Sequence, residues 1–279
     1  MLRWTCCLCT VGQVVHKLPE GKSVDGVTSL ADEVYVLRRK ERDEVEVGVY
    51  DVINYRLQRR LTIPDIRVFN DMTSCEHYRS VYIADSSGAC IHRLDVQGAV
   101  TQWAVNDIPQ GISVNAAHNV LVTCRHVRKI KEFSSQGDLL RELILPDDVI
   151  NAWHAIQTRN GEFIVCHGGL GDQVHRVCKI SADGRHIIKS YGGQPGLRID
   201  QYNMPVHLVV NDNEFVFVAD NFNRRVTLLS PTLDYIRQVV SPDDLKGSPN
   251  RLCLDIHRQR LYVADNECFV TGRVVVFSV

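Results

Sequence analysis

The sequence repeats one short unit along its length, and this repeat constrains the fold more than any other feature. In FVFVADNFNRRVTLLSP, residues 215–231, an apolar run ends in Ala-Asp, a polar turn carries two arginines, and a second apolar run follows. LYVADNECFVTGRVVVFSV, near the C-terminus, has the same pattern. A period in the forties indicates a repeat architecture. Aligning the chain on the end of the first apolar run gives six anchor positions at intervals of 47, 39, 43, 53 and 45 residues: Arg38, Asp85, Cys124, His167, Asp220 and Asp265.

Each repeat unit divides into four runs separated by turns, which indicates four β-strands. Asn-Gly between apolar runs, as in the turn RNGE at residues 159–162, is a strong signal for a tight hairpin. The run FVFVA is apolar at consecutive positions, so both faces of this strand should be buried between neighbouring units. Four antiparallel strands repeated radially are typical of a β-propeller blade. The sequence therefore predicts an all-β, six-bladed β-propeller of four-stranded antiparallel blades.

The six predicted blades together form one domain of residues 1–279. The last unit ends after its third strand, so its fourth strand must come from elsewhere in the chain. We expect residues 9–18, CTVGQVVHKL, to supply it, because pairing this strand into the last blade closes the ring and removes an exposed sheet edge. The expected blade ranges are 22–64, 65–107, 108–148, 149–201, 202–247 and 248–279.

Composition excludes some classes of function. The net charge is −1, so any nucleic acid or acidic partner needs a local basic face. No apolar run is long enough to span a membrane. Most of the ten cysteines are scattered singly, as Cys124 and Cys166 are inside apolar runs, which is typical of reduced core cysteines in the cytoplasm. The cluster Cys6, Cys7 and Cys9 has no partner set at zinc-site spacing, so we expect a plain strand or tail there.

The most regular units resemble a known family. VADNFNRRVTLL, residues 218–229, is similar to the NHL repeat, whose core has Val-Ala-Asp, a short Asn-containing loop, and Arg-Val before an apolar strand. IADSSGACIHRL and VADNECFVTGRVVVF are looser versions, and PQGI at residues 109–112 matches the Pro-x-Gly-Ile that precedes such units. Three units depart from the pattern, since Arg38, Cys124 and His167 replace the aspartate.

The resemblance implies the fold and the functions of NHL propellers. These domains typically form the C-terminal part of tripartite-motif proteins and bind RNA or protein partners, whereas related six-bladed propellers include lactonase-like hydrolases and lyases. No cysteine and histidine ladder of a RING or B-box precedes the repeats. The aspartate of each Ala-Asp is expected to be structural, since its carboxylate can accept backbone N–H groups of the following loop.

The loops between the second and third strands carry a recurring set of basic residues. In a propeller these loops share one face with the loops between blades, and binding sites are usually built on such loops. A cationic face would bind RNA or an acidic protein partner. Ordinary solvated charges are the alternative, because Glu41, Asp43 and Glu44 dilute the first cluster. The predicted binding face consists of Arg38, Arg39, Lys40, Arg125, His126, Arg128, Lys129, Arg224 and Arg225.

A second candidate site lies where the first strand of each blade should reach the central channel, at Met72, Gly111, His154, His207 and Arg251. His154 and His207, in successive blades, could bind a metal, which gives the alternative function of a metal-assisted lactonase or lyase. The next blade offers the cation Arg251 rather than a third ligand. We therefore expect hydrogen-bonded channel histidines, with no catalytic residue, metal or cofactor. The long loop 192–205 is a candidate lid or partner contact.

Overall fold

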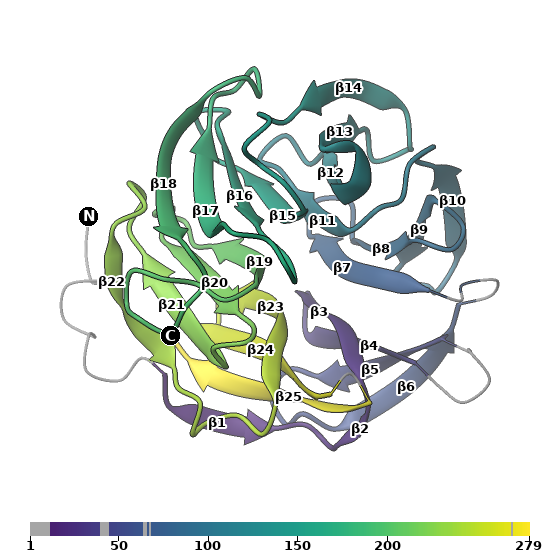
Figure 1. The fold of residues 1–279 in the computed structure, drawn as a ribbon. Coiled ribbons are helices and arrows are strands. Elements are labelled where there is room, and N and C mark those ends of the chain that lie inside the picture. The colour runs from purple at the N-terminus through teal and green to yellow at the C-terminus, as the bar shows by residue number, and fades with distance from the viewer. Residues whose placement is uncertain (1–11, 40–44, 64–65, 67, 269) are drawn as a thin grey trace.

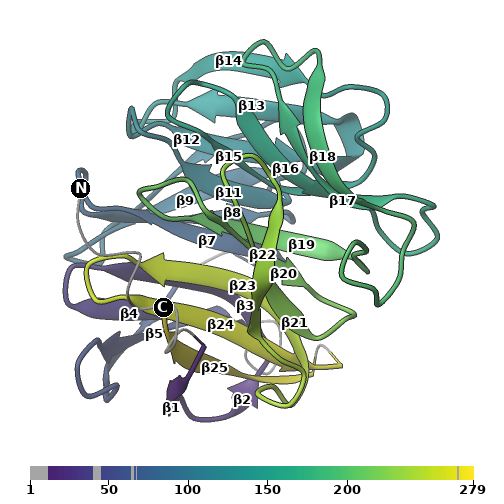
Figure 2. The ribbon, with the colours of Figure 1, turned by 90° about the vertical axis from the view of Figure 1, so that its left-hand side faces the viewer.

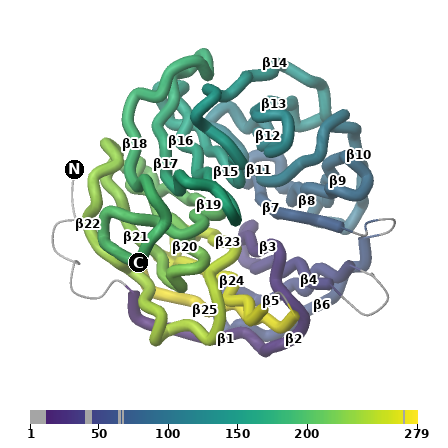
Figure 3. Tube along the Cα trace, in the orientation of Figure 1, coloured from purple at the N-terminus to yellow at the C-terminus, as the bar shows by residue number. Residues whose placement is uncertain are grey.

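The computed structural model of the chain describes all residues except 1–11, 40–44, 64–65, 67 and 269. Six antiparallel sheets are arranged in a ring (Figure 1). The chain passes around the ring in sequence order, as the colours of Figure 3 show. The all-β, six-bladed propeller predicted from the sequence is confirmed.

Blades 1 to 3 each contain four consecutive antiparallel strands. Blade 1 consists of β3 (Val24–Leu30), β4 (Glu33–Arg39), β5 (Val45–Asp51) and β6 (Leu57–Thr62). Blade 2 consists of β7 (Phe69–Cys75), β8 (Ser80–Asp85), β9 (Cys90–Asp95) and β10 (Val100–Ala104). Blade 3 consists of β11 (Gly111–Val114), β12 (Val120–Cys124), the short 3-10 helix η2 (Arg125–Val127), β13 (Lys129–Phe133) and β14 (Leu139–Ile144).

Blades 4 and 5 follow the same plan, whereas blade 6 combines both ends of the chain. Blade 4 consists of β15 (Ala152–Gln157), β16 (Phe163–His167), β17 (His175–Ile180) and β18 (Ile187–Gly193). Blade 5 consists of β19 (Pro205–Val210), β20 (Val216–Asp220), β21 (Arg225–Leu229) and β22 (Tyr235–Val240). Blade 6 consists of β23 (Ser248–Asp255), β24 (Arg260–Glu267), β25 (Thr271–Ser278), β1 (Val14–Lys17) and β2 (Gly21–Lys22).

The N-terminal strand closes the ring. β1 pairs antiparallel with β25, so that Val14 lies opposite Phe277, and β2 pairs with the opposite end of β25. Figure 2 shows β1 and β2 beside β25 at the outer edge of the molecule. The predicted closure is confirmed, with a shorter strand than the expected 9–18, of which residues 9–11 lie outside the described part of the chain.

The hydrophobic core is divided among the contacts between blades. Six clusters of buried apolar side chains are present, and each joins two neighbouring blades. The second strands are enclosed on both sides, so every residue of β8 and of β20 is buried. This enclosure explains why these strands are apolar at consecutive positions rather than at alternate ones. The fourth strands form the outer edge, and most of β14 is exposed.

Two general features follow from the described residues. They include no helix with the length and apolar character needed to cross a membrane. The seven cysteines among them form no disulfide with one another, and six of the seven are buried.

Candidate functional site

One residue near the start of each first strand takes the same place in the ring. Each pairs with the residue before the anchor position of its own repeat, on the second strand. In five blades a register shift interrupts the strand pairing next to this residue. Each first strand also contacts the first strands of the two neighbouring blades, which brings these residues together. The six ring positions hold Gly26, Asp71, Gly111, His154, His207 and Arg251.

Asp71 joins its own blade to four others. Its Oδ2 accepts a hydrogen bond of 3.0 Å from the Ile112 N–H in blade 3, and its Oδ1 lies 3.1 Å from Nε of Arg251 in blade 6. The Nε2 atoms of His154 and His207, in blades 4 and 5, lie 3.6 and 3.3 Å from this carboxylate. Asp71 is 1% exposed and Arg251 is 6% exposed, so two opposite charges neutralise each other inside the protein.

Both channel histidines are neutral imidazoles. Burial lowers the pKa of His154 to about 3 and also lowers the pKa of His207. His207 Nδ1 accepts a hydrogen bond from the Leu252 N–H at 3.3 Å, and the two imidazole centroids are 4.0 Å apart. Burial acts to raise the pKa of Asp71, but the surrounding His207, Arg251 and His154 hold it below its usual range. The group therefore carries one negative and one positive charge.

Glycine at two ring positions leaves room for the larger side chains. A Cβ atom on Gly26 would lie 2.7 Å from Cβ of Met72, and a Cβ atom on Gly111 would overlap the carbonyl oxygen of Trp153. Any larger residue would push the neighbouring blades apart. Because glycine has no side chain, these two positions leave space in which the side chains of Asp71, His154, His207 and Arg251 can meet.

The structure brings His154, His207 and Arg251 together, and it adds a carboxylate that sequence reasoning missed. Met72, the expected residue of blade 2, lines the channel cavity and also packs between blades 1 and 2, but Asp71 takes the ring position. Ligand atoms of Asp71, His154 and His207 lie within 4.8 Å of one another and could hold a metal ion. The guanidinium group of Arg251 already supplies a positive partner to this carboxylate.

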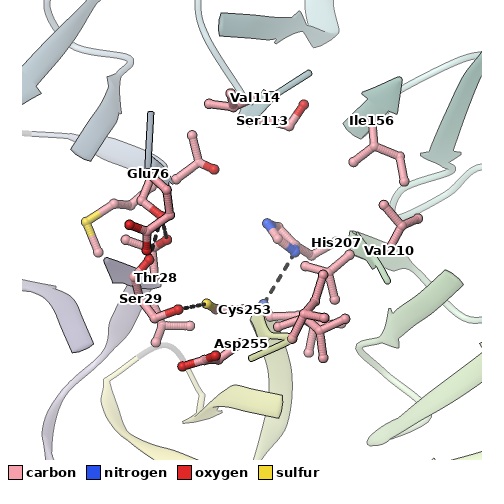
Figure 4. Close-up of a pocket in the computed structure, with 18 of the residues that line it drawn as sticks. Thr28, Ser29, Glu76, Ser113, Val114, Ile156, His207, Val210, Cys253 and Asp255 are labelled. Atoms are coloured by element: carbon pink, nitrogen blue, oxygen red, sulfur yellow. Dashed lines mark hydrogen bonds between the residues drawn. The ribbon is translucent and has the colours of Figure 1, made fainter. Parts of the chain in front are cut away.

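The channel widens into a cavity of about 840 Å³ (Figure 4). His154 and His207 line its inner end, and Glu76 and Arg258 line it near the turns between first and second strands. Figure 4 shows His207 beside the cavity, across from Glu76. The cavity therefore lies toward the face that carries these turns, here called the turn face. It extends away from the loops that carry the predicted basic residues.

The loops between second and third strands and the loops between blades form the opposite face, here called the loop face. Three arginines of the predicted binding face direct their guanidinium groups at main-chain carbonyls there. Arg38 donates to carbonyls of residues 19, 22 and 272, and Arg224 donates to carbonyls in the loop 242–247. Arg225 is 7% exposed, donates to Asp220 at 2.7 Å, and donates to three carbonyls of the loop 192–205. These arginines hold loops of the fold in place.

The remaining basic residues are more exposed. His126 is exposed, and Lys40 lies outside the described residues. Three of the others each lie beside one carboxylate, which reduces the net positive charge of this face. The pairs are Arg39–Asp25, Arg128–Asp147 and Lys129–Glu142, with nitrogen–oxygen distances of 3.3, 2.6 and 2.8 Å.

Arg125 differs from these three because it contacts an aromatic ring instead of a carboxylate. Its guanidinium carbon lies 4.0 Å from the ring centroid of Trp153, and its Nε donates to Asn151 Oδ1 at 2.9 Å. A cation over an indole ring is an attractive pair that also fixes the direction of the side chain. The guanidinium group of Arg125 is thus held in one position on the loop face by Trp153 and Asn151.

Sequence reasoning also missed a set of exposed apolar side chains. Leucine, isoleucine and valine in loops are a signal that could have revealed them. On the turn face, exposed large apolar residues among those described are Ile53 and Tyr78. On the loop face they are Val68, Ile108, Val127, Ile150, Leu170, Leu197, Ile199, Phe222 and Val270.

Comparison with known proteins finds similarity of fold. No protein-family model and no curated protein matches the chain. A protein of unknown function from Bacteroides caccae is 13% identical, with a TM-score of 0.64, over 85% of this chain and 84% of that one. A Kuenenia stuttgartiensis hydrazine synthase chain is 12% identical, with a TM-score of 0.66, over 95% and 98%. A catalytically inactive virginiamycin B lyase from Staphylococcus aureus with quinupristin is 12% identical, with a TM-score of 0.63, over 94% and 88%.

At these levels of identity the similarities show the propeller fold alone. They show neither an NHL repeat nor a tripartite-motif protein, so the finer resemblance of residues 218–229 stays a prediction. The functional argument therefore rests on the surfaces and side chains of this chain.

Proposed function

We propose that this propeller is a non-catalytic binding module that docks an acidic protein segment on its loop face. The observation that carries the proposal is the concentration of exposed apolar side chains there. Of the exposed large apolar residues among those described, nine lie on the loop face, two lie on the turn face, and eight are spread along the outer strands β1, β6, β14, β18 and β22. Exposed apolar side chains bordered by polar residues are typical of protein interaction sites. Loops preformed on a rigid ring also lose little conformational entropy when a partner binds.

Arg125 lies in the middle of one part of this surface. Its guanidinium group packs over Trp153 and against the loop that carries Leu170. Val127 follows in the same 3-10 helix, and Ile150 precedes the asparagine to which Arg125 donates. We call Arg125, Val127, Ile150 and Leu170 the blade 3–4 patch. Among the described residues Arg125 contacts Trp153 and Asn151 and feels the charge of the nearby Asp172 without pairing with it directly, so its guanidinium group can pair with an acidic group of the partner.

The loop 192–205 forms a second part of the surface. Arg225 and Asn223 donate hydrogen bonds to its carbonyl oxygens and hold it against blade 5. Leu197 and Ile199 within it are nevertheless 76% and 60% exposed. A firmly held loop that directs aliphatic side chains into solvent favours partner contact over a moving lid.

The composition of the loop face favours a protein partner over RNA. Binding of single-stranded RNA relies on aromatic side chains that stack on bases. Phe222 is the one aromatic side chain among the nine exposed apolar residues of the described loop face. Pairing of Arg128 and Lys129 with carboxylates also reduces the attraction for phosphates. We further propose that the repeats are of the NHL type, whose domains in tripartite-motif proteins bind RNA or protein.

Replacing Leu170 and Leu197 with aspartate should weaken partner binding. Selection from a displayed random peptide library against the purified protein should enrich peptides with aliphatic residues beside Asp or Glu. Their affinity for the Leu170→Asp/Leu197→Asp variant should fall roughly 10- to 100-fold, because truncating central interface residues typically costs 1–3 kcal/mol. The control is Ile53→Asp, which replaces an exposed apolar residue of the turn face with an aspartate and should bind as the wild type does. Isothermal titration calorimetry measures all three.

Two results would contradict the proposal. Selected peptides could bind both aspartate variants equally well, which would place the site away from the loop face. Alternatively, the protein could enrich no peptide but bind short RNAs in a salt-dependent manner, which would assign the face to RNA.

A second candidate function is metal-assisted hydrolase or lyase chemistry at the channel, through His154 and His207. It is supported by the ligand atoms of Asp71, His154 and His207 within 4.8 Å of one another, beside a cavity. One protein of similar fold is a streptogramin B lyase, at 11% identity. The pairing of Arg251 with Asp71 at 3.1 Å favours the non-catalytic function, because a metal ion would face this cation.

Metal content separates the two functions. After loading with zinc and gel filtration, the His154→Gln/His207→Gln variant should retain as much metal as the wild type. Inductively coupled plasma mass spectrometry measures the ratio of metal to chain. If this variant folds but loses one metal equivalent, the result would support the enzyme function. It would also show that the pairing of Arg251 with Asp71 does not prevent metal binding in the channel.

A further inference from the structure

Two blades contain a buried pair of aspartate and arginine at the anchor position of the repeat. In blade 5 Asp220 lies opposite Arg225, whose Nε is 2.7 Å from the carboxylate. In blade 6 Asp265 lies opposite Arg273, whose Nε is 2.9 Å from the carboxylate. Each pair is nearly inaccessible to solvent. The arginine neutralises a carboxylate that would otherwise be costly to bury.

Blade 2 keeps the aspartate but lacks the arginine. Asp85 lies opposite Cys90, at the position that Arg225 has in blade 5, and His92 follows two residues later on the same strand. The carboxylate Oδ1 accepts hydrogen bonds from the N–H groups of the next loop, at Ser87 and Gly88. Oδ2 is left to face Cys90 and His92. All three side chains are buried, with exposed fractions of 1%, 8% and 3% for Asp85, Cys90 and His92.

The three free ligand atoms form a compact triangle. Asp85 Oδ2 lies 3.2 Å from His92 Nε2, His92 Nε2 lies 3.4 Å from Cys90 Sγ, and Cys90 Sγ lies 3.6 Å from Asp85 Oδ2. Zinc binds nitrogen and oxygen at about 2.0–2.2 Å and sulfur at about 2.3 Å in a tetrahedron, which separates nitrogen from oxygen by about 3.3 Å and sulfur from either by about 3.5 Å. The triangle therefore has the dimensions of one face of a zinc tetrahedron.

The fourth position of the tetrahedron faces the outer strand of the blade. Gln102 of β10 lies opposite His92, and its Oε1 is 4.0 Å from Cys90 Sγ. Gln102 is exposed, so a water molecule or its amide oxygen can complete the coordination.

We propose that Asp85, Cys90 and His92 bind one zinc ion, which takes the place that arginine has in blades 5 and 6. Ser87 and Gly88 satisfy Oδ1 of the buried carboxylate, so Oδ2 is the atom that needs a partner: hydrogen bonds from Cys90 and His92, or a metal cation bound by all three side chains. A thiolate and an imidazole together select zinc over magnesium or calcium, which prefer oxygen ligands. Binding forms a bond between zinc and Cys90 Sγ and releases the thiol proton to solvent. The site lies below the loop 86–89 of blade 2, and it shares no residue with the channel or with the proposed partner contacts.

Cobalt substitution tests the proposal on the full chain. The protein is freed of metal with a chelator and titrated with Co²⁺. We expect one equivalent to bind with a thiolate-to-cobalt absorption band and the visible bands of a tetrahedral site, and zinc to displace it. Cys90→Ser should remove the thiolate band, and His92→Gln should weaken binding roughly 100-fold or more. Either variant is informative if the other fails to fold.

Three control variants locate the metal. A Cys6→Ser/Cys7→Ser/Cys9→Ser variant tests the cysteine cluster near the N-terminus, and Cys268→Ser tests the exposed thiol; both should keep the band. Cys90→Arg/His92→Thr rebuilds the pair of blade 5. It should fold, lose the band, and melt at the same temperature with or without zinc, whereas zinc should raise the melting temperature of the wild type. A wild type that folds, shows no thiolate band and gains no stability from zinc would overturn the proposal in favour of a cluster of Asp85, Cys90 and His92 held by hydrogen bonds alone.

Discussion

Replacing Asp71 with alanine should cost about 3–5 kcal/mol of unfolding free energy, because it leaves the buried guanidinium group of Arg251 without its carboxylate. The same substitution removes the acceptor of the Ile112 N–H in the next blade. A loss of this size is a large part of the 5–15 kcal/mol that typically stabilises a domain. Urea denaturation followed by circular dichroism measures it.

Two further variants show whether the loss of stability comes from the unpaired charge of Arg251 or from lost packing. Asp147, which pairs with Arg128 but has a side chain 94% exposed, is the matched control, and Asp147→Ala should change stability by less than about 0.5 kcal/mol. The double variant Asp71→Leu/Arg251→Met removes both buried charges at once. It should be more stable than Asp71→Ala, since apolar replacement of a whole buried pair is often tolerated. An Asp71→Ala protein within 1 kcal/mol of the wild type would mean that this carboxylate does not hold the ring together.

Stability should fall steeply as the pH decreases from about 6.5 toward 4.5. Burial lowers the pKa of His154 to about 3, of His167 to about 4, and lowers that of His207. An unfolded histidine has a pKa near 6.5, so near pH 5 the unfolded chain binds about two more protons than the folded one at His154 and His167, and the lowered pKa of His207 acts in the same direction. Burial acts in the opposite sense on Asp220, whose raised pKa of about 6 lets the folded state bind one proton more near pH 5. The net difference is therefore about one proton or more near pH 5, which corresponds to roughly 1.4 kcal/mol per pH unit or more.

Variants assign this pH dependence to particular side chains. His154→Gln and His167→Gln should each reduce the slope of stability against pH, by about 1.4 kcal/mol per pH unit near pH 5. His126→Gln, at an exposed position of the loop face, is the control and should leave the slope unchanged. Denaturant titrations at several pH values between 4.5 and 7 give the slopes. Equal slopes in the wild type and in both buried-site variants would contradict the assignment of neutral buried histidines.

The repeat predicted the ring, but it could not place every channel residue. His154 and His207 each lie 13 residues before the anchor of their repeat, and counting back 13 residues from Asp85 selects Met72. Blade 2 has one more residue between its ring position and its anchor, so Asp71 pairs with Ala84 and takes that place. A single additional residue thus decided whether Asp71 or Met72 takes the ring position, and spacing alone does not contain that information.

The direction of a side chain is the other feature that the sequence left open. Arg225 begins a strand after a polar turn, which is compatible with an exposed or an inward guanidinium group. The buried Asp220 draws it inward, and this attraction depends on a strand pairing that only the fold creates. The same pairing brings Cys90 and His92 to Asp85. A comparison of Cys90 with Arg225 at the same offset from the anchor could have revealed that blade 2 needs another positive charge.

The strand that completes blade 6 has a consequence for how the chain acquires its structure. Val14 pairs with Phe277, so β1 meets its partner only after nearly all of the chain is in place. Contacts between such distant segments carry a high loop-closure entropy and form slowly. During synthesis β1 is made early, but its partner β25 is made only after the strands of the first five blades. Joining β1 to β25 is therefore expected to be a late event in folding, and the free edge of β25 is the surface most open to mispairing until then.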